Sequence, residues 1–351
     1  MKQSMKKIAA LALTLILIAA LSLTACAQSV GRVFTDSTGR EVTVDQEISK
    51  IAVTGPLSQI VVFAIAPDML VGIPSAWNPA AKAFLDEQYY SLPVIGQLYG
   101  GKGDLNLEEL LKAAPQVVID IGEPKGSIAA DMDALTEQTG IPFVHISAYL
   151  EHMDETYAML GELLGLEEEA SVLAETCRRI YSRTVEMMQG VEKVNMLYVT
   201  GENGLNVLAN GGYHSGVIDM MANNVAVVES VSSKGTGNEV DMEQILIWNP
   251  DVIVFSENSI YDTVGEDPVW QSVSAIANNR YYEVPFGPYN WIGQPPAVQR
   301  LLGMMWMGKL LYPEAATYDL YDEVALYYQL FYHCDLTREQ YDALTAKAID
   351  K

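Results

Sequence analysis

Basic residues are scarce in this chain of 351 residues. It has 21 lysine and arginine residues against 45 aspartate and glutamate residues, which gives a formal net charge of −24. Sequence-independent nucleic-acid binding needs clustered lysine and arginine to neutralise phosphates, and adsorption to an anionic lipid surface needs a polybasic segment. The composition argues against both kinds of binding, and we predict no nucleic-acid partner.

Cysteine and histidine are also scarce, with three and four copies. An iron–sulfur cluster needs about four thiolate ligands, and a zinc site built on histidines needs short ligand spacings. The histidines are instead scattered, as His145, His152, His214 and His333. For Cys177 and Cys334 we expect two buried thiols, with a disulfide bridge as the alternative. We therefore predict no metal centre and no resident cofactor.

The common catalytic and nucleotide-binding motifs are missing as well. The glycine-rich stretch Gly100–Asp104 has neither the spacing nor the hydroxyl residue of a phosphate-binding loop. No Gly-x-Gly-x-x-Gly fingerprint of a dinucleotide site follows a strand pattern. Gly212–Gly216 places its serine at the wrong position for the Gly-x-Ser-x-Gly elbow of serine hydrolases. The sequence therefore predicts a protein that is not an enzyme.

The first 25 residues have the pattern of a secretory signal. Three lysines precede an apolar run from Ile8 to Leu23, which is too short and wrongly flanked for a membrane span. The run ends in Leu-Thr-Ala-Cys, which resembles the bacterial lipoprotein box, so we predict that Cys26 carries lipid and anchors the protein on the extracytoplasmic face of the cell membrane. A chance cysteine beside an ordinary cleavage site is the alternative. Removing three lysines and no acidic residue moves the net charge from −24 to −27, so the acidity belongs to the folded part.

Short β-branched runs alternate with helical patterns in the rest of the chain. Ile51–Val53, Val117–Ile121 and Phe143–Ile146 have the pattern of buried parallel strands, each followed by a turn and a helix. The stretch 106–119 recurs without a gap as 241–254, and in both copies Asn or Asp caps a helix that a proline ends before a buried strand. The pattern predicts an α/β protein with two Rossmann-like βα lobes.

A long, charged helical pattern lies between the two lobes, from Met153 to Gln189. A single helix of about 25 residues would span roughly 38 Å, enough to run along both lobes, and Gly161 and Gly165 indicate that a shorter helix precedes it. We expect a lipoprotein signal peptide at 1–25, a tether at 26–32, an N-terminal lobe at 33–150, an interlobe helical linker at 151–190, a C-terminal lobe at 191–335 and a C-terminal helix at 336–351.

Several stretches resemble one protein family in their order along the chain. They are Phe34–Val44, Leu92–Gly96, Asp267–Trp270, Asn279–Pro285 and Leu301–Pro313. They are similar to the solute-binding proteins of ATP-driven (ABC) importers for iron siderophores, haem and cobalamin, the class III periplasmic binding proteins, over nearly the whole chain after the signal segment. The resemblance implies two lobes joined by a single long α-helix and a transported metal chelate held in the cleft between them. It also implies an ABC permease and its ATPase as partners, and we expect a monomer.

The turns after the predicted strands should face this cleft, because ligands in open α/β sheets bind beyond the carboxyl ends of the strands. Rigid aromatic faces bury large flat chelates well, which favours the aromatic residues of these turns as contacts. The predicted ligand-binding residues are Thr54, Pro56, Trp77, Tyr99, Lys102, Tyr213, His214, Tyr289 and Trp291.

The resemblance implies two further roles for residues near the cleft. His214 or Tyr213 would be the axial ligand if the cargo is haem. Lys102, Lys125 and Arg300 are the only basic residues that we place near the cleft, which favours a corrinoid, haem or hydroxamate chelate over a tri-anionic catecholate.

The resemblance also implies that each lobe docks on the permease through a surface carboxylate, and by position Glu87 and Asp219 are the candidates. Two other functions stay open. A carrier for a small oxyanion such as molybdate would use backbone N–H groups at helix N-termini after glycine-rich loops. A surface chelatase would use His214 and Glu257 as acid and base.

Overall fold

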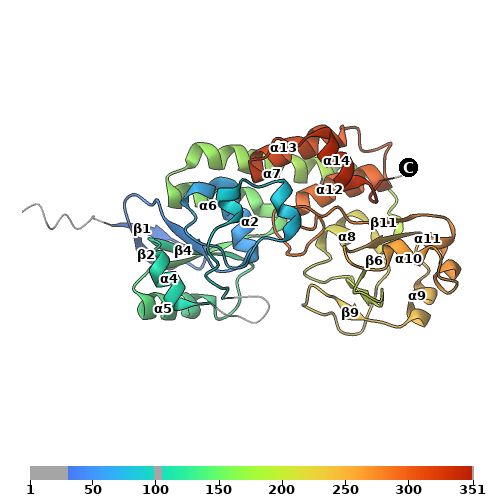
Figure 1. Ribbon diagram of the computed structural model, residues 1–351, viewed down its shortest axis with the longest axis horizontal. Coiled ribbons are helices and arrows are strands. Elements are labelled where there is room, and N and C mark those ends of the chain that lie inside the picture. The colour runs from blue at the N-terminus through green and yellow to red at the C-terminus, as the bar shows by residue number, and fades with distance from the viewer. Residues whose placement is uncertain (1–30, 99–104, 350–351) are drawn as a thin grey trace, which may run out of the picture.

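The computed structural model describes residues 31–98 and 105–349, which form two α/β lobes side by side (Figure 1). The first lobe contains the hairpin β1 (Arg32–Thr35) and β2 (Glu41–Val44), the strands β3 (Ile51–Val53), β4 (Val117–Gly122) and β5 (Phe143–Ser147), the helices α2 (Pro56–Ile65), α3 (Glu87–Tyr90), α4 (Leu107–Ala113) and α5 (Ile128–Thr139), and the short 3-10 helices η1 (Pro67–Met69) and η2 (Pro79–Ala83). Its sheet is parallel, with the strand order β3-β4-β5. The predicted α/β class with two lobes is confirmed.

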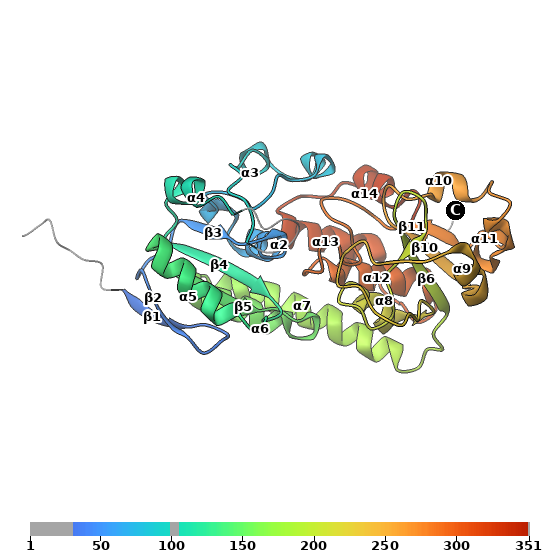
Figure 2. The same ribbon diagram turned by 90° about the horizontal axis from the view of Figure 1, so that it is seen from below.

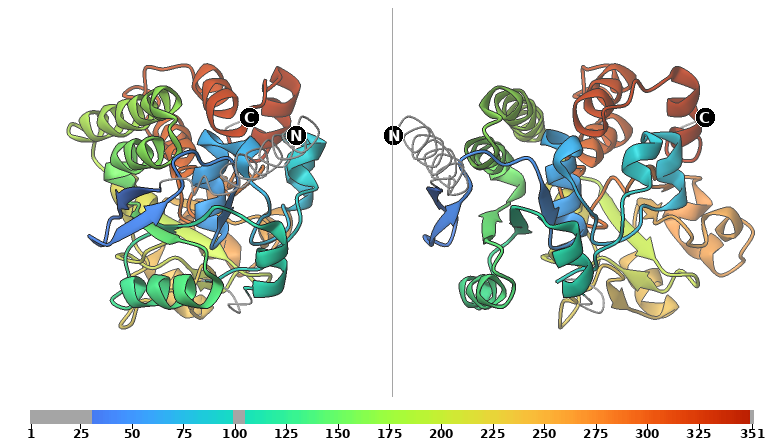
Figure 3. Two further views of the ribbon diagram at one scale, coloured as in Figure 1. Left: turned by 90° about the vertical axis from the view of Figure 1, so that its left-hand side faces the viewer. Right: turned by 60° about the vertical axis from the view of Figure 1, so that its left-hand side comes forward.

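The strands of this sheet are buried on both faces because their residues alternate between two layers of helices. Val117 and Ile119 pack in the same core as α2, whereas Val118 packs with Leu110 of α4 and Met132 of α5. Figure 3 shows these helices on opposite sides of the sheet. Continuous apolar strands are typical of such a parallel sheet, and in Figure 2 the β4 arrow points toward the second lobe. The carboxyl end of β4 therefore faces the junction between the lobes.

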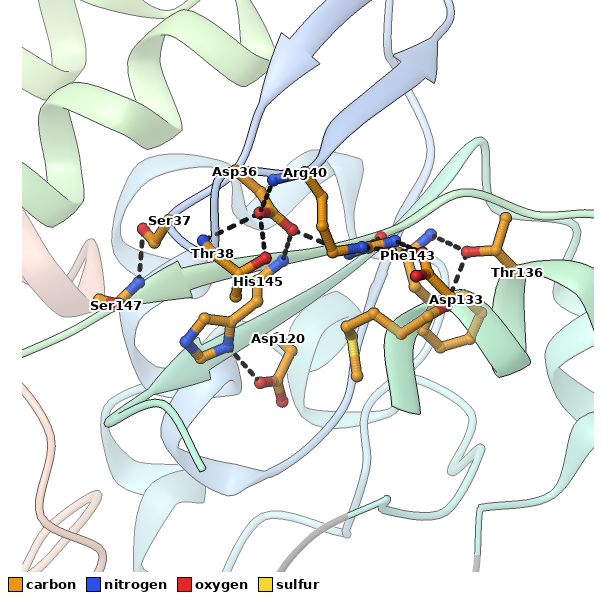
Figure 4. A network of polar contacts seen from close by, with 11 residues as sticks. Asp36, Ser37, Thr38, Arg40, Asp120, Asp133, Thr136, Phe143, His145 and Ser147 are labelled. Carbon is orange, nitrogen blue, oxygen red and sulfur yellow. Dashed lines mark hydrogen bonds and ion pairs between the residues drawn. The ribbon is translucent and has the colours of Figure 1, made fainter. Parts of the chain in front are cut away.

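The β1–β2 hairpin is held against the edge of this sheet by the buried side chain of Asp36 (Figure 4). Asp36 Oδ1 accepts a hydrogen bond from the Thr38 N–H at 2.9 Å, and Oδ2 accepts from the Arg40 guanidinium at 2.8 Å and from the His145 N–H at 3.2 Å. Burial raises the pKa of Asp36, but hydrogen bonds from Thr38, His145 and Arg40 outweigh it and hold the pKa below its ordinary value of 3.8. The ionised carboxylate thus ties the hairpin to β5.

Two helices, α6 (Met153–Leu164) and α7 (Glu167–Met188), follow the 3-10 helix η3 (Leu150–His152). Gly165, at φ +69°, ends α6, and the chain then turns back along it. Of the pair, α7 with its 22 residues crosses to the second lobe, where it packs on α12 (Arg300–Leu311), while α6 stays against α2 and β5 (Figure 2). At 1.5 Å per residue α7 spans roughly 33 Å. The long helix is therefore shorter than the 25 residues expected from the sequence.

The second lobe has a mixed sheet with the strand order β11-β10-β6-β7-β9, and β8 pairs with β6. Its strands are β6 (Asn195–Thr200), β7 (Asn206–Val207), β8 (Asn223–Asn224), β9 (Asn238–Glu239), β10 (Val252–Phe255) and β11 (Tyr281–Glu283), and its helices besides α12 are α8 (Gly216–Met221), α9 (Met242–Trp248), α10 (Tyr261–Val264), η4 (Trp270–Ser272) and α11 (Ser274–Ala277). The predicted repeat folds alike in both lobes: Asn106 caps α4, Asp241 caps α9, and a left-handed residue ends each helix before β4 or β10. Equivalent turns of the two lobes therefore follow equivalent strands.

The last two helices, α13 (Leu320–Tyr332) and α14 (Arg338–Thr345), contact both lobes. Phe331 of α13 packs on Tyr157 of α6 with ring centroids 6.0 Å apart, and α13 also packs on α2. Gln340 of α14 donates to the Ala83 carbonyl of the first lobe at 2.9 Å, while the nearby Lys347 pairs with Asp262 of the second. The segment expected to complete the C-terminal lobe at 191–335 thus ends in a helix that packs on the first lobe, because its aromatic rings are buried against α2 and α6. Across residues 31–98 and 105–349, no helix has the length and apolar character needed to cross a membrane.

Candidate functional site

A cavity of about 560 Å³ lies where the first lobe, α7 and the second lobe meet. Its size falls within the range of small-molecule binding sites. It is lined by Glu123, which directly follows β4, by Tyr149, Leu150 and Glu151 before α6, by Tyr181 of α7, and by Gly211, Gly212, Tyr213, Gly216, Met220 and Arg300 of the second lobe. Residues from both lobes and from the linker helix thus enclose one space, which we call the interlobe pocket.

Arg300, the first residue of α12, supplies the only positive charge among the described residues of this lining. Its side chain is buried, with 5% of the residue exposed, and its Nε donates to the Ala297 carbonyl at 3.3 Å. Burial lowers the pKa of Arg300, while the neighbouring Tyr213 and Glu123 act in the opposite direction. Among the residues that the structure describes, no carboxylate lies close enough to form an ion pair with the guanidinium. Because a buried charge is costly unless it is paired, the guanidinium has unused capacity for an anionic group of a ligand.

Two carboxylates in the pocket influence this charge from a longer distance. Burial raises the pKa of Glu123, Arg300 lowers it, and the charge of Glu151 raises it again, with a net upward shift. The lining therefore combines one cation with two acidic side chains. It suits a ligand that has one local anionic group and a small total charge.

Three tyrosines, Tyr149, Tyr181 and Tyr213, add aromatic faces and hydroxyl groups to the pocket. Burial raises the pKa of Tyr213, and burial followed by the charge of Glu151 raises that of Tyr181. These two phenols therefore stay neutral at physiological pH and act as hydrogen-bond donors as well as acceptors. Together the tyrosines offer both apolar contact and hydrogen bonds to a ligand.

The predicted ligand-binding residues do not include Tyr149, Tyr181 or Glu123, and Arg300 was expected only as a basic residue near the cleft. The rule that turns after strands face the cleft, applied to Phe143–Ile146, points to Tyr149, which follows β5 by two residues. Tyr181 had no such signal, because the face that a linker helix turns toward the cleft depends on how the lobes are placed.

Three of the predicted contacts are core residues in the structure. Trp291 is 0% exposed, and Trp77 and Thr54 are nearly as buried. The Trp77 ring nitrogen donates to the Tyr89 carbonyl at 3.0 Å, and the Thr54 hydroxyl donates to Asp120. These side chains do not offer a ligand an accessible face in this structure. Burying a large aromatic side chain in the core is more favourable than leaving it in a wet cleft. Composition and position alone therefore misplaced the two tryptophans.

Pro56 and Tyr289 are half-buried. Pro56 is the first residue of α2, where its missing N–H costs nothing. The Tyr289 ring lies 5.7 Å from that of Trp77, so it packs across the lobe junction. Tyr99 and Lys102 lie outside the described residues.

Tyr213 and His214 are neighbours in sequence but line different cavities. His214 lies in a cavity of about 410 Å³ at the carboxyl ends of β6 and β10, where its Nδ1 is 2.7 Å from the Gly293 carbonyl. Since a carbonyl only accepts, Nδ1 is the donor in this hydrogen bond. Glu257 lines a third cavity, with Phe84 and Lys347, and accepts from Asn290 at 2.7 Å. His214 and Glu257 therefore do not share a cavity as an acid–base pair.

The two carboxylates predicted for permease docking and the two cysteines have different surroundings. Glu87 is exposed at the start of α3 and accepts from the Ser91 hydroxyl at 2.8 Å. Asp219 is half-buried in α8 and accepts three hydrogen bonds. Cys177 is buried, Cys334 is partly buried, and both are free thiols. Within residues 31–98 and 105–349, no group of three histidine, cysteine or acidic side chains could hold a metal ion.

Comparisons with known proteins point to one class of protein. A family model described as periplasmic binding protein matches residues 51–287, more than half of the chain. An ABC transporter solute-binding protein from Sulfurospirillum deleyianum has 25% identity and a TM-score of 0.81, over 90% of this chain and 99% of that one. A periplasmic solute-binding protein from Veillonella parvula has 27% identity and a TM-score of 0.74, over 90% and 98%. A molybdate-bound periplasmic binding protein from Haemophilus influenzae has 22% identity and a TM-score of 0.70, over 87% and 99%. No curated protein matches the chain.

Proposed function

Because the chain belongs to the periplasmic binding protein family and is a solute-binding protein of an ABC importer, we propose that its cargo is a compact metal chelate held in the interlobe pocket. The buried guanidinium of Arg300, beside three tyrosines in a pocket of about 560 Å³, is the observation that carries this proposal. The guanidinium binds one anionic oxygen group of the chelate. The tyrosines pack on its organic part.

The charges of the lining narrow the class of chelate. The lining has one arginine and two carboxylates, Glu123 and Glu151, so a tri-anionic catecholate would meet electrostatic repulsion in the pocket. A flat haem or corrinoid needs wide apolar faces, whereas this lining is rich in hydroxyl and charged groups. An oxygen-rich chelate of low charge, such as a ferric hydroxamate, fits both constraints.

The proposal includes the place where the protein works. A lipid on Cys26 would keep the two lobes beside the permease on the extracytoplasmic face of the membrane, and an anchor of two or more acyl chains is stable. Glu87 is the docking carboxylate that we propose for the first lobe, since it is exposed and accepts a hydrogen bond from the neighbouring Ser91 hydroxyl.

Affinity measurements on Arg300→Gln test the proposal. The full chain in detergent is titrated with ferric desferrioxamine B, and binding is followed by quenching of tryptophan fluorescence. We expect the substitution to weaken binding by at least about tenfold, since a hydrogen bond to a charged group contributes roughly 1.5–3 kcal/mol. The matched control is Arg338→Gln, because Arg338 is exposed on α14 and contacts Asp342 instead of the interlobe pocket. Equal affinities of Arg300→Gln and the unchanged protein would contradict the proposal.

A small oxyanion is the second candidate for the cargo. One solved neighbour binds molybdate, and a single guanidinium is a natural partner for an oxyanion. Calorimetric titration with sodium molybdate separates the two functions. Tight molybdate binding without binding of the ferric chelate would replace the chelate proposal.

A further inference from the structure

The segment Gly211–Tyr213 is part of the second lobe and lines the interlobe pocket. The carboxylate of Asp219, in α8, accepts a hydrogen bond from this segment. We infer that Asp219 is a positioning residue, which sets the place of Tyr213 in the pocket through hydrogen bonds to the turn before it. This inference rests on the proposed function only in taking the interlobe pocket as the cargo site.

The two oxygens of Asp219 accept hydrogen bonds from three separate groups. Oδ2 accepts from the Gly211 N–H at 2.9 Å and from the Ser215 hydroxyl at 2.7 Å. Oδ1 accepts from the side-chain amide of Asn224 at 2.8 Å. Hydrogen bonds to an ionised carboxylate are the stronger kind, so the carboxylate links the turn, the start of α8 and β8.

Ser215 extends this support to the next residue of the turn. Its hydroxyl donates its one proton to Asp219, so its oxygen is free to accept from the Gly212 N–H at 3.0 Å. The N–H groups of Gly211 and Gly212 are therefore both used inside the protein. These two N–H groups are thus not available to a cargo on this side of the pocket.

Asn224 connects the same carboxylate to the sheet. It is buried, its amide also donates to the Leu208 carbonyl at 3.1 Å, and its strand β8 pairs with β6. The backbone of the turn needs this support, because Gly211 has φ +77° and glycine loses more conformational freedom on folding than any other residue. Loss of the Asp219 carboxylate would thus release a turn of special geometry.

The chemistry of the site calls for a carboxylate. An asparagine at position 219 has one oxygen, and its amide N–H groups would face a donor from Gly211, Ser215 or Asn224. At least one of these three hydrogen bonds is then lost, although the side chains have the same shape. Asp219→Asn therefore tests the charge and the acceptor with little change in packing.

The experiment compares Asp219→Asn with Glu87→Gln in the full chain in detergent, without permease. We expect Asp219→Asn to weaken binding of ferric desferrioxamine B by about tenfold and to speed hydrogen exchange at the amides of Gly211 and Gly212. Glu87→Gln should leave both unchanged. Normal affinity and normal exchange in Asp219→Asn would overturn the inference.

A double-mutant cycle with Tyr213→Phe separates positioning from general loss of structure. If Asp219 acts through Tyr213, the two substitutions together weaken binding less than the product of their separate effects. If the effects of the two substitutions on the dissociation constant multiply, Asp219 and Tyr213 act independently, which contradicts the inference.

If the unchanged protein binds neither the chelate nor molybdate, the proposed function fails. Hydrogen exchange at Gly211 and Gly212 still decides whether Asp219 holds the turn.

Discussion

At the scale of single residues, charged side chains inside the structure have two different kinds of surroundings. The carboxylates of Asp36 and Asp219 each accept several hydrogen bonds from the protein and organise the backbone around them. The guanidinium of Arg300, which is buried, has one hydrogen bond to a backbone carbonyl. Satisfied charges of this kind support the fold, whereas a charge with unused donors at a pocket is a candidate for ligand binding.

Asp36 leads to a prediction about pH. Its pKa is lowered in the folded state, so the ionised carboxylate stabilises the protein above the ordinary value of 3.8, and this contribution is lost as the pH falls through the lowered folded-state pKa. We expect the free energy of unfolding, measured with urea from about pH 7 to about pH 3, to fall more steeply with acid in the unchanged protein than in Asp36→Asn. Asp133→Asn is the comparison variant, because it removes an exposed carboxylate that pairs with the same Arg40 and leaves the buried Asp36 in place. Parallel curves for Asp36→Asn and the unchanged protein would show that the hydrogen bonds to Asp36 contribute nothing.

At the scale of elements, the close contact of α6 and α7 determines how the linker leaves the first lobe. Gly161 of α6 faces Ala170 of α7, and a Cβ at Gly161 would lie 2.6 Å from the Ala170 Cβ. No side chain larger than hydrogen fits between the two helices at this point. Since α7 supplies Tyr181 to the interlobe pocket, the spacing of the two helices also affects the site.

Gly161→Val tests this contact. We expect the substitution to lower the free energy of unfolding by about 1–3 kcal/mol, because the added methyl groups overpack the helix pair. Gly190→Val is the matched control, since nothing lies within 4 Å of a Cβ at Gly190. Urea unfolding followed by circular dichroism measures both variants. An equally small effect at both positions would mean that α6 and α7 adjust their spacing freely.

At the scale of the whole molecule, local patterns predicted the lobes but only part of the pocket lining, namely Tyr213 as a ligand contact and Arg300 as a basic residue near the cleft. The repeat 106–119 and 241–254 was recognisable because capping residues and buried strands leave their own local signals, and both copies fold as expected. Trp77 and Trp291 were misplaced because an aromatic residue in a turn has the same sequence pattern whether it faces solvent or core. Tyr181 and Arg300 meet in one pocket only through the packing of α7 and α12. Contacts of that kind depend on the arrangement of the lobes and carry no local signal.

The central claim is that one cargo contacts both lobes and the helix between them. It is tested most directly by measuring whether the cargo protects segments of both lobes. The measurement is hydrogen exchange of the full chain with and without ferric desferrioxamine B or molybdate, whichever binds. We expect slower exchange in both 149–151 and 211–213, the segments that line the pocket from opposite lobes. Slower exchange confined to one lobe, or found instead around His214 and Ser256 in the separate cavity of the second lobe, would contradict it.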